Sequence, residues 1–275
     1  MKFPVALQLY SVRDDAKANL DDTLRQVKEM GYDGVEFAGM YDYTAEQIRD
    51  LCAKYDLVPI SAHVPIKAMI EDVKGTFEQY KTIGCKYVVI PHVSADFCKA
   101  DENFPKLVEY AAEFGKVAKD MGLQLGYHNH DFEFTNMIGE KHMLDELYDS
   151  VDADLLKTQL DTCWVNVGGE NPSEYVRKYA GRCPTVHLKD FVGQKSENMY
   201  ALIGVKNDAD KKAAENQEFE LRPVGSGVQD FPAILKAAEE SGAQWVIVEQ
   251  DRPAFGKTPL ECAKMSIDYL KTINL

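Results

Sequence analysis

The amino-acid sequence predicts an α/β fold of the (β/α)8 TIM-barrel type. Short apolar runs alternate with amphipathic stretches that have helical spacing, and this alternation occurs eight times. The units recur at roughly 25 to 40 residues, which is the period of a β/α barrel. A doubly wound open sheet shows the same alternation with fewer strands. The count of eight, together with the lack of a GxGxxG motif after the first apolar run, favours the barrel.

The predicted strands are the apolar runs, and the predicted helices are the stretches with apolar residues three or four positions apart. The strands are expected at 3–9, 34–37, 58–62, 87–90, 123–127, 155–160, 184–186 and 245–248. The helices are expected at 20–30, 44–55, 66–83, 104–121, 143–150, 172–179, 231–241 and 258–273. Gly31 is placed to end the first of these helices, and Thr44 with Gln47 forms a capping-box pattern at the start of the second. Pro259 is suited to the first turn of the last helix.

Length and composition indicate one barrel domain that spans residues 1–275. The chain has 45% hydrophobic and 28% charged residues, as soluble globular proteins do. One long segment, 192–224, is polar and departs from the alternation. It is interpreted as an inserted loop over the carboxyl-end face of the barrel, with a short helix at 208–215. Such a loop acts either as a lid over the site or as a solvated surface segment.

The net charge of −14 argues against a nucleic-acid partner, because such proteins depend on clustered Lys and Arg. No apolar run approaches the roughly 20 residues that cross a bilayer, so no membrane partner is expected. No signal-sequence pattern follows Met1, and the six cysteines include no CxxC pair. These observations predict a cytoplasmic protein.

Polar side chains able to bind a metal lie at the ends of most predicted strands. They are His63, His92, His128, His130, Asp161, His187 and Glu249. Because the carboxyl ends of parallel strands meet at one face of a barrel, these side chains are expected to share a cleft. Imidazole and carboxylate together form the mixed nitrogen and oxygen set that suits Zn²⁺, Mn²⁺ or Fe²⁺.

Several motifs resemble the xylose isomerase-like barrels of the sugar phosphate isomerase/epimerase superfamily. They are LQLYSVRD, GYHNH, LDTCW, VHLKD, PVGSGVQDFPAIL and VIVEQD, and the resemblance covers nearly the whole chain. It implies one divalent metal ion held by four side chains at strand ends. Mn²⁺ is the expected ion, with Zn²⁺, Mg²⁺, Fe²⁺ and Co²⁺ as alternatives.

Three ligands follow from matching these motifs residue by residue: Asp161, His187 and Glu249. The fourth ligand in the family is usually a Glu in a motif such as LENH. In this chain YHNH puts His128 at that position. His130 or Glu133 is the alternative fourth ligand.

The resemblance implies an isomerase or epimerase that acts on a sugar or sugar phosphate. Glu249 or His128 would remove a proton next to a carbonyl, giving a metal-stabilised enediolate. The His in place of a Glu alters the pKa of one acid–base group and the face of the sugar from which it works. A metal-dependent lyase or dehydratase acting on a keto-sugar, ketoglycoside or keto-inositol is therefore the alternative.

Four further residues are candidates for substrate binding. His63 and His92 are suited to sugar hydroxyls, with a structural role as the competing interpretation. Lys189 is able to neutralise an oxyanion or phosphate, or else to pair with Asp190. Arg222 precedes the PVGSG turn and is interpreted as an anion binder, with a surface ion pair as the alternative.

The expected partner is a small-molecule sugar, and a homodimer is expected from the resemblance. Glu36 is expected to support the floor of the site through hydrogen bonds. Two rival interpretations remain. The endonucleases that cut DNA at abasic sites share this barrel type, but they carry a basic surface that the net charge of −14 does not fit. A sugar-binding barrel without catalytic activity is the other.

Overall fold

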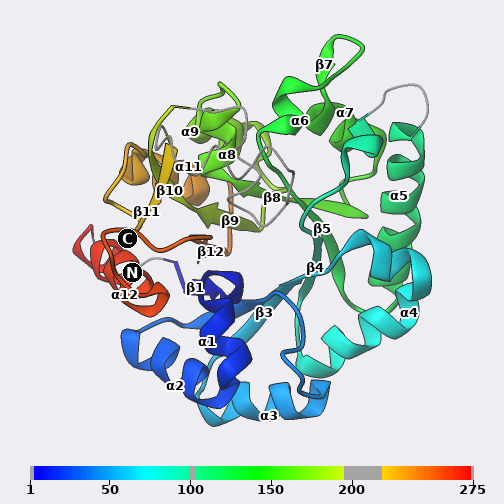
Figure 1. Cartoon of the computed structure of the whole chain (residues 1–275). Coiled ribbons are helices and arrows are strands. Elements are labelled where there is room, and N and C mark those ends of the chain that lie inside the picture. The colour runs from blue at the N-terminus through cyan, green and yellow to red at the C-terminus, as the bar shows by residue number, and fades with distance from the viewer. Residues whose placement is uncertain (1–2, 99–102, 195–218, 274–275) are drawn as a thin grey trace.

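Eight parallel strands close into a barrel, which confirms the predicted fold class (Figure 1). The computed structural model describes residues 3–98, 103–194 and 219–273. The barrel strands, in the order in which they pair around the closed sheet, are β1 (Val5–Gln8), β12 (Trp245–Val248), β9 (Thr185–Leu188), β8 (Leu156–Asp161), β5 (Gln124–His128), β4 (Tyr87–Ile90), β3 (Val58–His63) and β2 (Gly34–Phe37). The barrel closes where Leu7 lies between Val248 and Val35 in the strand register.

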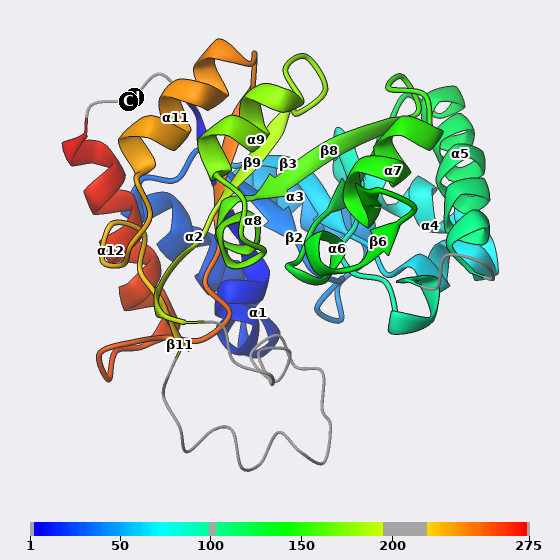
Figure 2. The same ribbon diagram turned by 90° about the horizontal axis from the view of Figure 1, so that it is seen from above.

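Helices surround the barrel and cover the outer face of its sheet. Those of the first half of the chain are η1 (Leu9–Val12), α1 (Arg13–Ala18), α2 (Leu20–Met30), α3 (Ala45–Lys54), α4 (Ile66–Ile83), η2 (Ala95–Cys98) and α5 (Phe104–Asp120). The second half supplies α6 (Phe132–Thr135), α7 (Met143–Ser150), α8 (Thr162–Val167), α9 (Pro172–Lys178), α11 (Phe231–Glu240) and α12 (Pro259–Thr272). Seen from above, α11 and α12 flank one side of the barrel, and α4 and α5 flank the opposite side (Figure 2).

The local signals at the helix ends act as the sequence predicts. Thr44 and Gln47 form the capping box of α3, so the side chain of each accepts a hydrogen bond from the other's backbone N–H. Pro259 lies in the first turn of α12, directly after its N-cap Thr258. Gly31 ends α2 with a φ of 102°, a left-handed conformation that glycine adopts without a steric penalty.

The barrel interior changes from apolar to polar along the strands. Side chains of alternate residues point inward, so one strand can contribute to both layers. In β12, Ile247 joins an apolar interior cluster with Ala6 and Val89. Two residues further on, Glu249 follows the end of the strand. The apolar layer supports the barrel, and the polar layer above it opens at the carboxyl ends, where a parallel barrel carries its functional groups.

The segment predicted as an inserted loop begins and ends in a two-stranded antiparallel ribbon of β10 (Asp190–Gly193) and β11 (Phe219–Arg222). The predicted helix at 208–215 lies outside the described residues. A second small ribbon, β6 (Met137–Ile138) with β7 (Lys141–His142), follows α6. None of the helices in the described ranges combines the length and apolar character needed to cross a membrane.

Candidate metal centre and pocket

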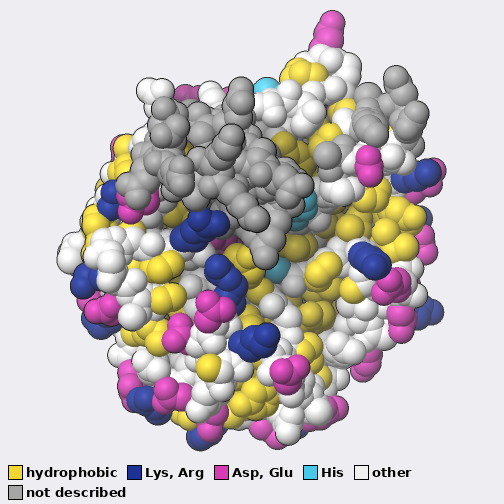
Figure 3. All heavy atoms as spheres, in the orientation of Figure 1, with side chains coloured by type: hydrophobic (Ala, Val, Ile, Leu, Met, Phe, Trp, Pro, Cys, Tyr) yellow, Lys and Arg dark blue, Asp and Glu magenta, His cyan; other side chains and the backbone are white. Residues whose placement is uncertain are grey.

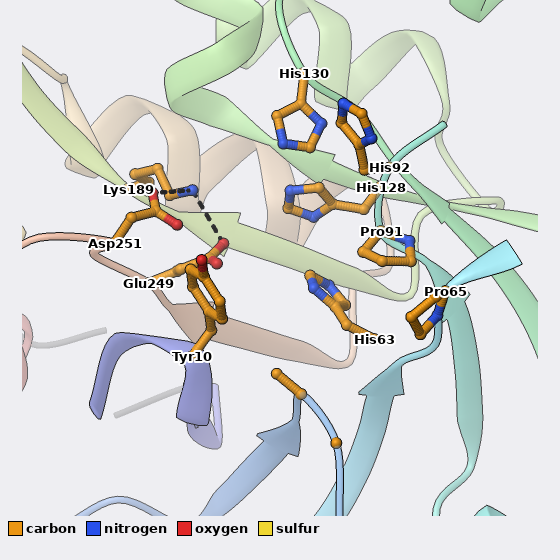
Figure 4. A pocket seen from close by; sticks show the side chains of 12 residues that line it. Tyr10, His63, Pro65, Pro91, His92, His128, His130, Lys189, Glu249 and Asp251 are labelled. Carbon is orange, nitrogen blue, oxygen red and sulfur yellow. Dashed lines mark ion pairs between the residues drawn. The ribbon is translucent and has the colours of Figure 1, made fainter. Parts of the chain in front are cut away.

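A pocket of about 370 Å³ opens at the carboxyl ends of the strands. Its lining residues are Tyr10, Ala38, Gly39, His63, Pro65, Pro91, His92, His128, His130, Lys189, Glu249 and Asp251. Histidine side chains come to the surface near the centre of this face (Figure 3). In the close view, Glu249, Asp251 and Lys189 lie on one side of the pocket, and His92 and His130 lie across from them (Figure 4).

Four side chains form a buried cluster that could hold a metal ion: His128, Asp161, His187 and Glu249. Their candidate ligand atoms all lie within 4.8 Å of one another. His187 Nδ1 is 2.9 Å from Glu249 Oε2, and His128 Nε2 is 3.7 Å from Asp161 Oδ2. Asp161 and His187 are fully buried beneath the open pocket, whereas His128 and Glu249 also line it. These are the four residues that the sequence analysis proposes as ligands.

The Asp161 carboxylate is held by one oxygen and leaves the other available. Asp161 is the last residue of β8 and the N-cap of α8, so Oδ1 accepts hydrogen bonds from the backbone N–H groups of Cys163 and Trp164. Oδ2 is buried and has no hydrogen-bond partner among the residues that the structure describes. Lys189 Nζ lies 3.2 Å from it. One fixed and one open oxygen suit a metal ligand, because the fixed oxygen sets the orientation of the other.

Lys189 lies among three carboxylates. Its Nζ is 2.9 Å from Asp251 Oδ2 and 3.1 Å from Glu249 Oε2, in addition to the contact with Asp161. The side chain is only 1% exposed. Burial by itself would lower the pKa of Lys189, but the three carboxylates outweigh burial and raise the pKa well above its usual range. Lys189 therefore keeps its positive charge inside the protein.

Negative charge exceeds positive charge at this centre. Burial, and then the charge of Glu249, raise the pKa of Asp161 and bring that of Asp251 to about 6, although Lys189 opposes both shifts. Burial would lower the pKa of His187, but the charge of Glu36 and the hydrogen bond to Glu249 raise it to about 10. These upward shifts reflect the buried negative charge that surrounds each group. A bound cation would supply the missing positive charge, and the mixed nitrogen and oxygen donors suit a divalent ion.

His128 is the neutral member of the cluster. Burial, followed by the neighbouring His187 and His63, lowers the pKa of His128 well below its usual range. A neutral imidazole offers one nitrogen lone pair, which is the form that binds a metal. A His where the resemblance leads us to expect a Glu therefore keeps a candidate ligand atom and carries one negative charge fewer.

The two alternative fourth ligands lie differently. His130 lines the pocket, with its ring centroid 5.3 Å from that of His128, but it does not belong to the four-residue cluster. Glu133 accepts hydrogen bonds from the Tyr127 hydroxyl at 2.9 Å and from the His130 backbone N–H at 2.8 Å. With both carboxylate oxygens engaged, Glu133 supports the His128–His130 segment. The geometry favours His128.

Of the four candidate substrate-binding residues, His63, His92 and Lys189 line the pocket, and Arg222 does not. Arg222 Nη2 pairs with Glu220 Oε2 at 2.8 Å, and the guanidinium lies over the Phe255 ring, 4.3 Å from its centroid. This arrangement matches the ion-pair alternative for Arg222. It does not place the guanidinium where a substrate in the pocket would touch it.

The sequence left open whether Lys189 forms an ion pair with Asp190, and in the structure it does not. Neighbouring residues of an extended chain point to opposite sides, so Lys189 faces the interior and Asp190 faces outward. The Asp190 carboxylate accepts hydrogen bonds from the backbone N–H groups of Gly225 at 3.0 Å and Gly227 at 2.7 Å. It also accepts from Gln229 N at 3.2 Å. Asp190 therefore links the VHLKD and PVGSG motifs.

Glu36 occupies the floor of the site. It is fully buried and accepts hydrogen bonds from Gln8 Nε2 and Gln159 Nε2, each at 2.7 Å, and from the Ser61 hydroxyl. Its Oε1 lies 2.8 Å from His187 Nε2. Burial would raise the pKa of Glu36, yet the charges of His63 and His187 hold it well below its usual range. The carboxylate thus stays ionised beneath the four-residue cluster.

Sequence reasoning missed three residues at this centre: Tyr10, Gln159 and Asp251. Tyr10 follows the first strand, and Asp251 comes two residues after Glu249. Gln159 comes two residues before Asp161 on β8, so the two side chains point to the same side of the strand. A search for every polar residue at or just beyond a strand end, including positions two residues apart, would have found them.

The family profile described as "Xylose isomerase-like TIM barrel" matches residues 24–273. The chain is 29% identical over 177 residues to an inosose dehydratase of Clostridium beijerinckii, which is 62% of this chain and 55% of that protein. It is 24% identical to an inosose dehydratase of Mesomycoplasma hyopneumoniae, over 93% of this chain and 89% of that protein. The first similarity thus spans about half of the relative's length, and the second spans most of it.

Solved structures share the fold. A sugar phosphate isomerase/epimerase from Parabacteroides distasonis has a TM-score of 0.78 and 20% sequence identity, and the match covers 98% of this chain and 94% of that one. A structure described as the IOLI protein with a bound zinc atom has a TM-score of 0.74 and 20% identity, with 98% of each chain covered. At these identities the likeness establishes the architecture.

Proposed function

Since this chain belongs to the xylose isomerase-like TIM barrel family, we propose that it is a divalent-metal-dependent lyase that removes water from a small polyhydroxy ketone of the inosose type. The observation that carries the proposal is the buried cluster of two imidazoles and two carboxylates at the base of a pocket. The inosose dehydratases that match most of the chain support this choice of reaction and substrate. The sequence alone favoured isomerisation or epimerisation and gave dehydration as the alternative.

The arrangement of acid–base groups also supports dehydration over epimerisation by two carboxylates. Epimerisation of that kind needs one carboxylate on each face of the sugar. In this pocket Glu249 and Asp251 lie on the same side, and the residues across from them are His92 and His130 (Figure 4). An elimination needs only one base, with a proton donor for the leaving hydroxyl.

His128, Asp161, His187 and Glu249 would hold the metal ion. When bound, a divalent ion acts as a Lewis acid that polarises the substrate carbonyl and acidifies the neighbouring C–H bond. Two imidazoles with two carboxylates suit Mn²⁺, Fe²⁺, Co²⁺ or Zn²⁺ better than Mg²⁺, which prefers oxygen ligands. Mn²⁺, the ion expected from the sequence, belongs to this group.

Glu249 is the proposed base. It lines the pocket, and Lys189 Nζ and His187 Nδ1 both contact its Oε2, which fixes the carboxylate. The C–H bond next to the carbonyl breaks, and its proton passes to Glu249. The electron pair forms a C=C bond as the C–O bond at the next carbon breaks. The departing hydroxyl takes up the proton that Glu249 received and leaves as water, which regenerates the Glu249 carboxylate.

Tyr10 and Lys189 are the proposed partners of the substrate oxygens. Tyr10 lines the pocket together with Glu249 (Figure 4). Burial raises the pKa of the Tyr10 hydroxyl, so it keeps the proton that it would donate to a substrate oxygen. Lys189 carries the ammonium that would stabilise an enolate oxygen. Pro65, Pro91 and the ring of His63 supply the flat, largely apolar walls that small-molecule pockets use.

The reaction can be tested with metal-loaded protein and inosose in D2O, followed by NMR. The expected product has lost one molecule of water. Exchange of deuterium into the ketone without loss of water would instead identify an isomerase or epimerase. If metal-loaded protein leaves inosose unchanged, the proposed substrate class is wrong. The Glu249→Gln variant should lower kcat by roughly 10²- to 10⁴-fold. Glu240→Gln, which alters a surface carboxylate paired with Arg177, is the matched control and should keep full activity.

A further inference from the structure

Gln159 connects the floor of the site to two histidines. Its side chain is 1% exposed and points into the barrel from β8. Its Nε2 donates hydrogen bonds to Glu36 Oε2 at 2.7 Å and to Thr185 Oγ1 at 3.2 Å. Its Oε1 lies 2.7 Å from His63 Nε2 and 3.2 Å from His128 Nδ1. β8 and β2 lie on opposite sides of the closed barrel, so the bond between Gln159 and Glu36 spans its interior.

The hydrogen-bond network permits one orientation of the Gln159 amide. Glu36 is a buried carboxylate that already accepts from Gln8 and Ser61, and a carboxylate has no proton to donate. The atom of Gln159 that faces it must therefore be the NH2 nitrogen. If the amide were turned over, two oxygens would face each other at 2.7 Å in a buried setting. The carbonyl oxygen of Gln159 must consequently face the two imidazoles.

An amide oxygen only accepts hydrogen bonds, so each ring nitrogen that it contacts carries a hydrogen. We propose that Gln159 is a positioning residue that holds His63 as the Nε2–H tautomer and His128 as the Nδ1–H tautomer. His128 is then left with an unprotonated Nε2, and this nitrogen lies 3.7 Å from Asp161 Oδ2 in the four-residue cluster. Glu36 and Gln159 thereby set which nitrogen of His128 is available to a metal ion.

Two consequences follow for the site. The effect on metal binding rests on the metal centre of the proposed function, whereas the tautomers follow from the hydrogen bonds alone. With Nδ1 bound to Gln159 and Nε2 directed to the metal centre, His128 has no nitrogen left to exchange a proton with substrate. Of the two bases that the sequence suggested, His128 and Glu249, only Glu249 keeps that role. His63 is bonded to Gln159 through Nε2, and the residue lines the pocket.

The tautomers can be measured directly by long-range ¹H–¹⁵N NMR on protein labelled with ¹⁵N in its histidine rings. The spectra would be recorded without metal and with Zn²⁺. His63→Asn and His128→Asn variants would assign the signals. The expected wild-type result is Nδ1–H for His128 and Nε2–H for His63. A wild-type His128 that carries its hydrogen on Nε2 would overturn the proposal without any variant of Gln159.

Zn²⁺ titration of Gln159→Met tests the consequence for the metal. The variant keeps the side-chain volume but removes the hydrogen-bond acceptor. His128 can then carry its hydrogen on Nε2, and this nitrogen no longer offers a lone pair to a metal ion. Metal affinity is expected to fall roughly 10- to 100-fold, as for other residues that orient metal ligands. Gln8→Met is the matched control. Gln8 is an equally buried amide that donates to the same Glu36 carboxylate, yet its amide is not bonded to His63 or His128.

The combined results separate the possible roles. The proposal is supported if Gln159→Met binds Zn²⁺ more weakly and has a changed His128 tautomer, while the metal affinity of Gln8→Met stays within about threefold of wild type. An equal fall in both variants, or an unchanged tautomer in Gln159→Met, assigns Gln159 a packing role and overturns it. If wild-type protein binds no divalent metal, the proposed function fails. The NMR result still decides the tautomers.

Discussion

Lys189 Nζ lies 3.2 Å from Asp161 Oδ2, inside a barrel where both side chains are almost completely buried. The ammonium therefore shares the carboxylates of the candidate metal centre, because it also contacts Glu249 and Asp251. Three carboxyl groups thus share one ammonium group, and His187 Nδ1 contacts only Glu249 among them. We expect both the lysine and a bound cation to balance the charge of this cluster, and this expectation can be tested by changing each in turn.

Lys189→Met should destabilise the metal-free protein by about 3–5 kcal/mol, since removal of one partner leaves buried charges uncompensated. Urea unfolding measures the loss. The control is Lys178→Met, which removes a half-exposed lysine 2.7 Å from Asp145 and should cost no more than about 1 kcal/mol. Equal effects of the two substitutions would show that the buried network does not depend on Lys189.

The Asp161→Asn substitution should separate two roles of this residue, as the N-cap of α8 and as a proposed metal ligand. The remaining oxygen can still accept from Cys163 and Trp164, so the metal-free protein should unfold at nearly the wild-type temperature. The NH2 group in place of Oδ2 cannot bind a cation. Wild-type protein should gain about 2.7 kcal/mol when Mn²⁺ or Zn²⁺ is present at 100 times its Kd, and the variant should gain little.

Asn171→Ala is the control for that experiment. Asn171 caps α9 through Ser173 and Glu174, away from the cluster. Its loss should cost about 1 kcal/mol but leave the response to metal intact. A full metal response in Asp161→Asn would remove Asp161 from the ligand set.

Removal of metal should abolish turnover and lower the unfolding temperature. Treatment with a chelator followed by dialysis leaves the four-residue cluster with its surplus negative charge, so activity should be lost. It should return when Mn²⁺, Co²⁺ or Zn²⁺ is added. Metal content and activity measured on the same samples test this. Full activity in protein that contains less than one tenth of an equivalent of metal would contradict the metal-dependent reaction.

Glu133→Gln should stabilise the protein at alkaline pH. Burial raises the pKa of Glu133 to about 8, although the Tyr127 hydroxyl and backbone N–H groups oppose the shift. In the unfolded chain the pKa of this carboxyl group is lower. At pH values between the two pKa values, folding is therefore accompanied by the uptake of a proton. The stability that depends on this proton is fully present at acid pH and is lost as pH rises towards 8. The neutral Gln, which can donate to Tyr127 and accept from His130, avoids that loss.

Urea unfolding at pH 5 and pH 9 measures the difference. The variant and wild-type protein should be similar at pH 5, and the variant should be more stable by up to a few kcal/mol at pH 9. Glu170→Gln, at a more exposed carboxylate that contacts His142, serves as the control for the loss of one charge. A variant that is less stable than wild type at pH 9 would contradict the shift.

Gly227→Ala should destabilise the loop that Asp190 holds. A Cβ at residue 227 would lie 2.3 Å from both Asp190 Oδ1 and Phe191 O. The loop must therefore move, at a cost of about 1–3 kcal/mol. Ser226→Ala, at the exposed neighbouring residue, should change the free energy of unfolding by less than about 0.5 kcal/mol. Thermal unfolding of the two variants compares them, and equal stability would contradict the close packing at Gly227.

Most of the metal centre could be predicted from the sequence because its residues interrupt apolar runs. His63, His128, Asp161 and His187 each occupy a position where a barrel strand ends or nearly ends, and parallel strands bring those ends together. Arg222 illustrates the opposite case. It lies next to a recognisable turn, but the direction of its side chain is set by Glu220 and Phe255, and neither contact has a sequence signature.

The sequence by itself determined the barrel and the strand ends that carry chemistry, because periodicity and strand ends are local properties of the chain. The resemblance to the xylose isomerase-like barrels then selected the four clustered side chains from the residues at those ends. Only the tertiary structure decided how these groups interact. Glu36 and Gln159 are 123 residues apart, and their hydrogen bond depends on closing eight strands in one register. The same closure brings Lys189 among three carboxylates from two other strands. Contacts across a barrel arise from its register and tilt, which no single strand encodes.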